Sequence, residues 1–216
     1  MKQRIASVTG LILAAGPSSR MGRDKLSLPF RGAPLLQRVV NAAREADLAR
    51  VVLVLPRDGA LKDAVDASGC DVVLIRDPPD QASSFRAGLS RAMDNAEGCM
   101  VLYGDQPLLD AKTLNHLIWA FSQQPEYMIA PVQEGLCGGP VITPAGWFQT
   151  AMEITGDAVL RKLAAMRGLT LRLVKIDDPG PFVGVDTHEE YQRLLALYDI
   201  PRPAGSAMKP AHASRA

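Results

Sequence analysis

Short apolar runs alternate with segments of helical periodicity along the first two thirds of the chain, and this alternation restricts the fold more than any other feature. The apolar runs occupy residues 11–15, 51–55, 72–75, 100–103 and 127–132, and the helical stripes occupy 35–43, 85–93 and 114–121. The runs at 51–55 and 72–75 are continuous, as is typical of strands buried on both faces. The pattern predicts a mainly parallel sheet with helices on both faces, a Rossmann-like three-layer α/β sandwich. Ligands bind such sheets at the carboxyl ends of the strands.

The last third of the chain is less regular. A segment rich in Gly and Pro spans 135–144, a helix is expected over 158–166, a strand over 171–176 and a final helix over 187–198. The tail at 201–216 holds three prolines and many small residues, and we expect it to be disordered. The sequence therefore predicts a single domain over residues 1–200.

Composition and charge exclude several classes of partner. With 24 basic and 23 acidic side chains the net charge is +1, which leaves no electrostatic footprint for a nucleic acid. No apolar run approaches the length that crosses a bilayer, and the first run is too short for a secretory signal. The 3 cysteines form no metal-binding or CxxC spacing, as expected for reduced thiols. We therefore expect a cytoplasmic protein that associates with neither membranes nor nucleic acids.

The loop after the first predicted strand carries the strongest chemical signal. Its sequence, residues 13–25, is L-A-A-G-P-S-S-R-M-G-R-D-K. Small residues let a nucleotide lie against the backbone, and exposed amides in such a loop can bind phosphate oxygens. Arg20, Arg23 and Lys25 supply the positive charge that a triphosphate requires before its α-phosphorus is attacked. The segment is not a P-loop, because five residues separate Gly16 from Gly22 and Lys25 follows three later.

This loop resembles the signature L-A-A-G-x-S-x-R-M-G-x-x-K of the nucleotidyltransferases that make dinucleotide forms of the molybdenum cofactor. Sugar-nucleotide pyrophosphorylases and methylerythritol-phosphate cytidylyltransferases are related to them. The resemblance covers residues 8 to 198 and implies a fold of the nucleotide-diphospho-sugar transferase type. It also implies that an NTP is bound by Leu13, Ala14, Ala15, Gly16, Arg20 and Lys25. Lys25 and Arg20 would then be catalytic, because they offset negative charge at the reacting phosphates.

Two aspartates are candidate metal ligands. Asp105 follows a strand within G-D-Q-P, which resembles the family element whose Asp binds Mg²⁺, a cation that prefers carboxylates, phosphate oxygens and water. Asp186 lies in V-G-V-D-T-H-E-E, which is similar to the family's D-I-D-T-P-E-D with Gly184 in place of the first Asp. The resemblance implies that Asp105 and Asp186 hold Mg²⁺ and that Asp105 also contacts the nucleotide. A turn aspartate at Asp105, and helix capping alone at Asp186 or Thr187, remain the alternatives.

A third segment bears on the base. Residues 77–88 resemble the N-P…G-M-S-S-S-L-R-A-G element of the cytidylyltransferase branch, with Asp77 where the family has Asn. The resemblance implies that Asp77, Ser83 and Ser84 contact the nucleotide and favours CTP as the donor, with GTP as the alternative. The other interpretation is that the two serines only cap the following helix.

The segment G-L-C-G-G-P-V resembles the family's G-x-x-G-H-P-V, which implies that Gly138, Gly139 and Pro140 lie at the acceptor. Gly139 replaces the histidine, and we expect this to open space and remove a donor. The resemblance favours molybdopterin as the phosphorylated acceptor and transient contact with a molybdoenzyme or its chaperone. Two alternatives stay open: a sugar- or polyol-phosphate acceptor, and a non-catalytic protein that binds and delivers the molybdenum cofactor.

Overall fold

A computed structural model describes residues 4–16, 25–76, 81–156 and 158–199. Its main sheet has the strand order β10-β7-β9-β6-β1-β4-β5, with β8 paired to β7. The strands are β1 (Val8–Leu13), β4 (Arg50–Pro56), β5 (Asp71–Ile75), β6 (Gly98–Tyr103), β7 (Met128–Gln133), β8 (Leu136–Cys137), β9 (Val141–Pro144) and β10 (Leu171–Lys175). The predicted residues Arg20, Arg23 and Asp77 and the tail at 201–216 lie outside the described residues.

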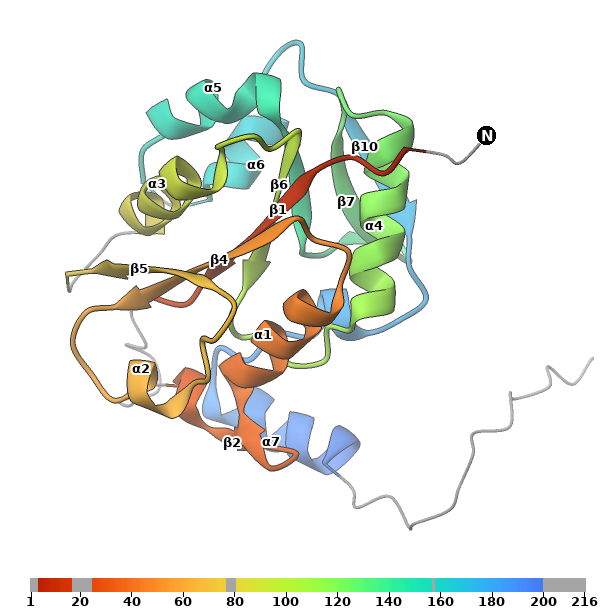
Figure 1. Ribbon diagram of the computed structural model, residues 1–216. Coiled ribbons are helices and arrows are strands. Elements are labelled where there is room, and N and C mark those ends of the chain that lie inside the picture. Colours follow the sequence, from red (N-terminus) through yellow and green to blue (C-terminus); the bar gives the residue numbers. More distant parts are fainter. Residues whose placement is uncertain (1–3, 17–24, 77–80, 157, 200–216) are drawn as a thin grey trace, which may run out of the picture.

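Helices cover both faces of this sheet (Figure 1). They are α1 (Leu35–Glu45), α2 (Leu61–Ala64), α3 (Gln81–Ala92), α4 (Ala111–Gln123), α5 (Phe148–Glu153), α6 (Val159–Ala164) and α7 (His188–Tyr198). Helices α1 and α4 share one buried cluster with Ile12, whereas α3, α5 and α6 share another with Leu11. Since Leu11 and Ile12 are neighbours on β1, their side chains point to opposite faces of the sheet. The predicted three-layer sandwich is confirmed.

The central strands are parallel, as predicted. Strand β1 lies between β4 and β6, so that Leu13 is paired with Val54 on one side and Tyr103 on the other. The runs in β1, β4 and β6 are almost completely buried, because helices cover both of their faces. The carboxyl ends of β1 and β6 therefore meet at one edge of the sheet.

One expectation about a strand was wrong. Strand β5 is an edge strand whose main neighbours, in the part of the chain that the structure describes, are α3 and β4, so Val72 and Leu74 are 44% and 43% exposed. A continuous apolar run therefore did not signify burial on both faces. The Gly- and Pro-rich segment forms β8 and β9, and β9 inserts antiparallel between β6 and β7. The sheet is consequently mixed in its second half.

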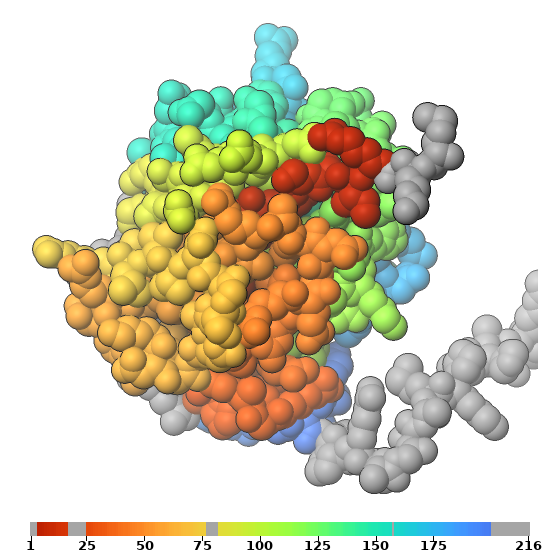
Figure 2. Space-filling view, viewed as in Figure 1, coloured from red at the N-terminus to blue at the C-terminus, as the bar shows by residue number. Residues whose placement is uncertain are grey.

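The last helix closes the structure against a small hairpin formed by β2 (Pro29–Phe30) and β3 (Ala33–Pro34). Tyr191 of α7 is buried, and its hydroxyl donates to the Pro29 carbonyl at 2.7 Å. Three short 3₁₀ helices complete the described elements: η1 (Lys25–Ser27), η2 (Ala145–Trp147) and η3 (Gly180–Phe182). In the space-filling view, the orange and yellow segments that include α1, α2 and β5 form much of the lower surface on this side (Figure 2). Among the described residues, no helix is long and apolar enough to span a membrane.

Candidate functional site

A small cavity of about 190 Å³ lies where β1 and β6 end. The two strand ends are joined there, since the Gly104 amide donates to the Leu13 carbonyl at 3.1 Å. The cavity is lined by Leu13, Gly16, Lys25, Leu26, Ser84, Tyr103, Gly104, Asp105 and Asp186. Six of these nine residues were predicted to bind nucleotide or metal. The parallel strands place them together because their carboxyl ends share one edge of the sheet.

Three charged side chains meet in this cavity. The Lys25 Nζ lies 2.7 Å from an Asp105 carboxylate oxygen and 2.7 Å from an Asp186 oxygen. Lys25 begins η1, Asp105 follows β6, and Asp186 precedes α7. The Asp105 carbonyl also accepts a hydrogen bond from the Val185 amide at 3.0 Å, which joins the last two segments. Segments that lie far apart in the sequence thus place two carboxylates and one ammonium within hydrogen-bonding distance.

Burial and charge shift the pKa values of this cluster. Burial raises the pKa of Asp105, Lys25 opposes that shift, and the neighbouring Asp186 adds to it. Burial alone would lower the pKa of Lys25, but the two carboxylates outweigh it and the pKa is raised. Lys25 therefore carries its charge at neutral pH.

The capping question at Asp186 is answered by its neighbours. The Thr187 hydroxyl accepts from the Glu190 amide at 3.2 Å, and the Glu190 carboxylate accepts from the Asp186 and Thr187 amides at 2.7 and 2.8 Å. This is a capping box, with Thr187 as the N-cap of α7. The Asp186 side chain takes no part in the cap and points to Lys25 instead.

The cavity fits a divalent cation. Asp105 and Asp186 each place an oxygen 2.7 Å from the same nitrogen, so the two carboxylates converge on the position of a single small cation. In the described part of the chain, no group of three or more His, Cys, Asp or Glu residues is placed to hold a metal ion. A metal ion bound by Asp105 and Asp186 would therefore need further ligands from outside this group of residues. Two carboxylates that leave the remaining positions to phosphate oxygens and water match the preference of Mg²⁺.

The two predicted serines lie within the first turns of α3, which already includes Gln81, so neither stands at its N-cap position. Ser84 is 3% exposed and lines the small cavity, whereas Ser83 is half-buried and does not line it. Gly88 lets α3 lie against β1 and β4, because a Cβ there would overlap Leu11 and Val54. That close packing, which the sequence analysis missed, holds Ser84 at the cavity.

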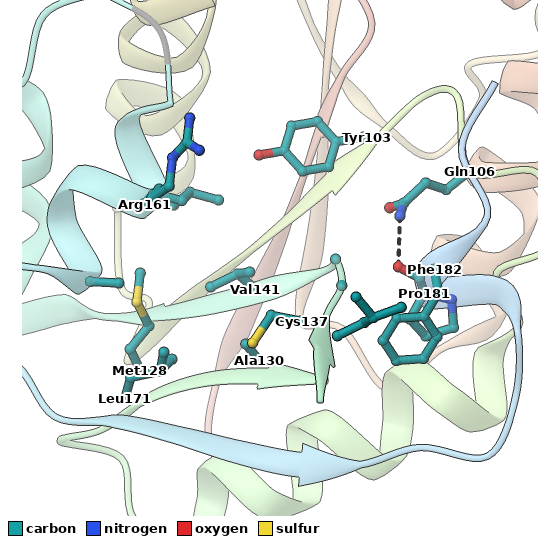
Figure 3. A pocket seen from close by; sticks show the side chains of 15 residues that line it. Tyr103, Gln106, Met128, Ala130, Cys137, Val141, Arg161, Leu171, Pro181 and Phe182 are labelled. Atoms are coloured by element: carbon teal, nitrogen blue, oxygen red, sulfur yellow. Dashed lines mark hydrogen bonds between the residues drawn. The ribbon is translucent and has the colours of Figure 1, made fainter. Parts of the chain in front are cut away.

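A second cavity, of about 670 Å³, adjoins the first and is mostly apolar (Figure 3). Its lining residues are Tyr103, Gln106, Met128, Ala130, Leu136, Cys137, Gly138, Gly139, Val141, Leu160, Arg161, Ala164, Leu171, Pro181 and Phe182. The predicted acceptor residues Gly138 and Gly139 are among them, whereas the buried Pro140 is not. All three cysteines are free, including Cys137 at this cavity. Tyr103 lines both cavities, and sequence reasoning had overlooked it.

Gly139 is packed closely by residues from the end of β6. A Cβ at position 139 would lie 3.2 Å from the Gln106 amide oxygen and 3.3 Å from the Tyr103 ring, so a side chain there would require these groups to shift by a few tenths of an ångström. The expectation that glycine opens space at this position stays a prediction. The contact with Tyr103 was not apparent from the sequence, in which Tyr103 only precedes Gly104 and Asp105 at a predicted strand end.

Comparison with known proteins agrees with the geometry. Residues 10–174 match the model of the MobA-like NTP transferase domain. The chain belongs to this family.

Two relatives match over most of their length. The purine catabolism protein PucB of Bacillus subtilis is 28% identical over 86% of this chain and 94% of its own. The nicotine blue oxidoreductase of Paenarthrobacter nicotinovorans is 30% identical over 87% of this chain and 96% of its own. The bifunctional protein GlmU of Cupriavidus necator is 35% identical over half of this chain, which spans only 24% of GlmU.

Solved structures of family members superpose well. Rv0371c of Mycobacterium tuberculosis H37Rv is 29% identical, with a TM-score of 0.80 over 89% of this chain and 99% of that one. A manganese complex of Rv0371c also matches, at 28% identity and a TM-score of 0.76, over 88% of this chain and 99% of that one. The CMP:2-keto-3-deoxy-manno-octonic acid synthetase complexed with CTP, at 17% identity and a TM-score of 0.70, covers 89% and 98% and shows the shared fold. The predicted nucleotide-diphospho-sugar transferase type of fold is confirmed.

Proposed function

We propose that this protein is a Mg²⁺-dependent nucleotidyltransferase that transfers a nucleoside monophosphate from an NTP to a phosphorylated acceptor and releases pyrophosphate. The observation that carries the proposal is the cluster of Lys25, Asp105 and Asp186 at the carboxyl ends of the strands. Membership of the MobA-like NTP transferase family and the manganese complex of the similar Rv0371c support it. We also expect the protein to act in the cytoplasm.

The residues of the small cavity have two proposed roles, which are to bind a metal ion and to offset negative charge on the phosphates. Asp105 and Asp186 would hold the metal ion, which supplies positive charge at the phosphates when it is bound. Lys25 already lies between these carboxylates, so a short movement of its side chain brings the ammonium to the triphosphate. There it offsets the charge that develops as pyrophosphate leaves. Arg20, outside the described residues, is proposed to assist on the same loop. The acceptor phosphate is already anionic and needs no general base.

The two cavities suggest how the substrates are arranged. Gly16 and Ser84 line the small cavity beside the charged cluster, which supports placing the NTP there, with CTP as the preferred donor. The adjoining apolar cavity is then available to the acceptor. Its walls offer few partners for the many hydroxyls of a polyol phosphate, and unpaired polar groups are costly to bury. The cavity therefore favours molybdopterin over a sugar- or polyol-phosphate acceptor.

The test is pyrophosphate release over a grid of four NTPs and three acceptors: molybdopterin, glucose 1-phosphate and ribitol 5-phosphate. We expect release with CTP and molybdopterin in the presence of Mg²⁺, and none after chelation with EDTA. Initial rates that favour GTP would overturn the choice of donor, and a preference for ribitol 5-phosphate would overturn the choice of acceptor.

Two further outcomes would overturn the activity itself. Molybdopterin binding without pyrophosphate release in any combination would favour a delivery protein. Reduction of nicotine blue without pyrophosphate release would instead align the chain with its relative that carries that oxidoreductase name.

A further inference from the structure

Tyr103 occupies the boundary between the two cavities. It is the last residue of β6, directly before Gly104 and Asp105, and it lines both the charged cavity and the apolar one. In Figure 3 its hydroxyl points across the cavity toward Arg161, the one charged residue in the lining.

The Tyr103 ring packs beside Gly139. A Cβ at Gly139 would lie 3.2 Å from the Gln106 amide oxygen and 3.3 Å from the Tyr103 ring, so a side chain there would press on both groups. The Pro181 carbonyl accepts one hydrogen bond from the Gly139 amide and another from the Gln106 side-chain amide, both at 3.0 Å, which holds Gly139 and Gln106 in place.

One buried polar atom lies beside this contact. The Gln106 side chain is 7% exposed, and its amide oxygen has no hydrogen-bond partner among the residues that the structure describes. The oxygen lies 3.2 Å from the position of a Cβ at Gly139, on the side that faces the apolar cavity in Figure 3.

We infer that Tyr103, packed over Gly139, is the specificity-determining residue for the acceptor and selects a flat heterocyclic ring system over a polyol. The inference rests on the proposed function and names the chemistry of its acceptor. The Tyr103 ring gives a planar acceptor a face on which to stack, and the phenol gives it a hydrogen-bonding group.

The first test is Tyr103→Leu, which keeps an apolar side chain but removes the ring and the hydroxyl. We expect the KM for molybdopterin to rise about tenfold, the scale of one lost contact in an apolar pocket, with smaller changes in kcat and in the KM for CTP, because Tyr103 also lines the small cavity. The KM of Tyr103→Phe for molybdopterin should lie between those of the wild type and of Tyr103→Leu. Tyr127→Leu is the matched control, because Tyr127 is a half-buried tyrosine that lines neither cavity, and all kinetic constants should stay unchanged.

The second test is a double-mutant cycle. Gly139→Ala should raise the KM for molybdopterin severalfold by pushing the Tyr103 ring aside, and the same substitution should have little further effect in a Tyr103→Leu background. Additive effects would overturn the proposed coupling between Tyr103 and Gly139. Equal losses in CTP and acceptor binding, or losses in kcat alone, would overturn the role of Tyr103 in specificity.

A binding measurement separates this inference from the proposed activity. The fluorescence of 6-hydroxymethylpterin reports its binding without turnover, so the Kd can be compared for the wild type, Tyr103→Leu and Tyr127→Leu. Weaker binding to Tyr103→Leu alone supports the inference even if no pyrophosphate release is found in any assay. Equal Kd values for all three proteins would overturn it while leaving the transferase activity open to its own test.

Discussion

The two adjoining cavities are built on opposite principles. The smaller, of about 190 Å³, holds an ammonium that lies 2.7 Å from each of two carboxylates. The larger, of about 670 Å³, is walled mainly by apolar side chains and has Arg161 as the one charged residue in its lining. We expect charge to position a ligand in the first and shape to select a ligand in the second. Substitutions should therefore affect catalysis strongly at the small cavity and substrate choice more weakly at the large one.

The largest effect is expected at Asp105. Asp105→Ala removes a predicted metal ligand and leaves Lys25 with Asp186 alone, so transfer should fall by about a thousandfold or more, the upper range for losing one charged or donor group at a reacting centre. Pyrophosphate release and Mn²⁺ binding, followed by isothermal titration in the presence of CTP, measure the two losses.

Asp66→Ala is the matched control for Asp105→Ala. Asp66 is a surface aspartate that also pairs with a basic residue, Arg44, at 3.1 Å, but it lies in neither cavity. Its activity and Mn²⁺ binding should match the wild type. Full Mg²⁺-dependent activity in folded Asp105→Ala would show that the carboxylate is only part of a turn.

Lys25→Ala should have the next largest effect, a loss of about a hundredfold in kcat, because its ammonium offsets charge that grows in the transition state. The Kd for CTP should change less than kcat does. Lys25→Arg should rescue poorly, because a planar guanidinium cannot fit as a compact charge between Asp105 and Asp186.

Steady-state kinetics of the two Lys25 variants test this role. Lys112→Ala is the control, because Lys112 is an exposed lysine on α4. Near-normal kcat in both Lys25 variants would mean that the lysine is merely a solvated residue on a loop. A Kd for CTP that rises as much as kcat falls would assign Lys25 to ground-state binding instead.

The sequence predicted the small cavity better than the large one, for a physical reason. Gly16, Lys25, Asp105 and Asp186 each lie in a short motif at a strand or helix end, and a parallel sheet brings such ends together. The large cavity instead depends on contacts between distant segments, such as Tyr103 over Gly139 and the Pro181 carbonyl beside both. No local pattern encodes those contacts, and the neighbours of Gly139 could not be known from the sequence.

The same distinction explains the fold. The strands around β1 were predicted correctly because their continuous apolar runs reflect burial under helices on both faces. The apolar run of β5 is similar, yet Val72 and Leu74 are exposed. The strand lies at the edge of the sheet, and a strand's own sequence does not show that it will lie at an edge. Strand β9 was missed because its four residues gain their place only from pairing with β6 and β7.

The smallest effect is expected at Arg161, and it sharpens the comparison because it asks whether the large cavity also uses charge. Arg161 is exposed on α6, and in the described part of the chain no carboxylate forms an ion pair with it, so its charge is available to an anionic group on the acceptor. Exposed pairs are weak and are screened by salt. Arg161→Gln should therefore raise the KM for molybdopterin only about threefold at low ionic strength, with kcat unchanged.

Two further measurements interpret the effect of Arg161→Gln on KM: its dependence on ionic strength, and the same substitution at a neighbouring arginine. The increase in KM should disappear at about 0.5 M salt, where the Debye length falls to a few ångströms. Arg167→Gln is the control, because Arg167 is equally exposed just beyond α6 but does not line the cavity. A similar increase in the Arg167 variant would assign the effect to the net charge of the protein. An increase that persists at high salt would mean that the Arg161 side chain contributes packing or a fixed hydrogen bond, and the large cavity would then select its ligand by direct contacts and not by long-range charge.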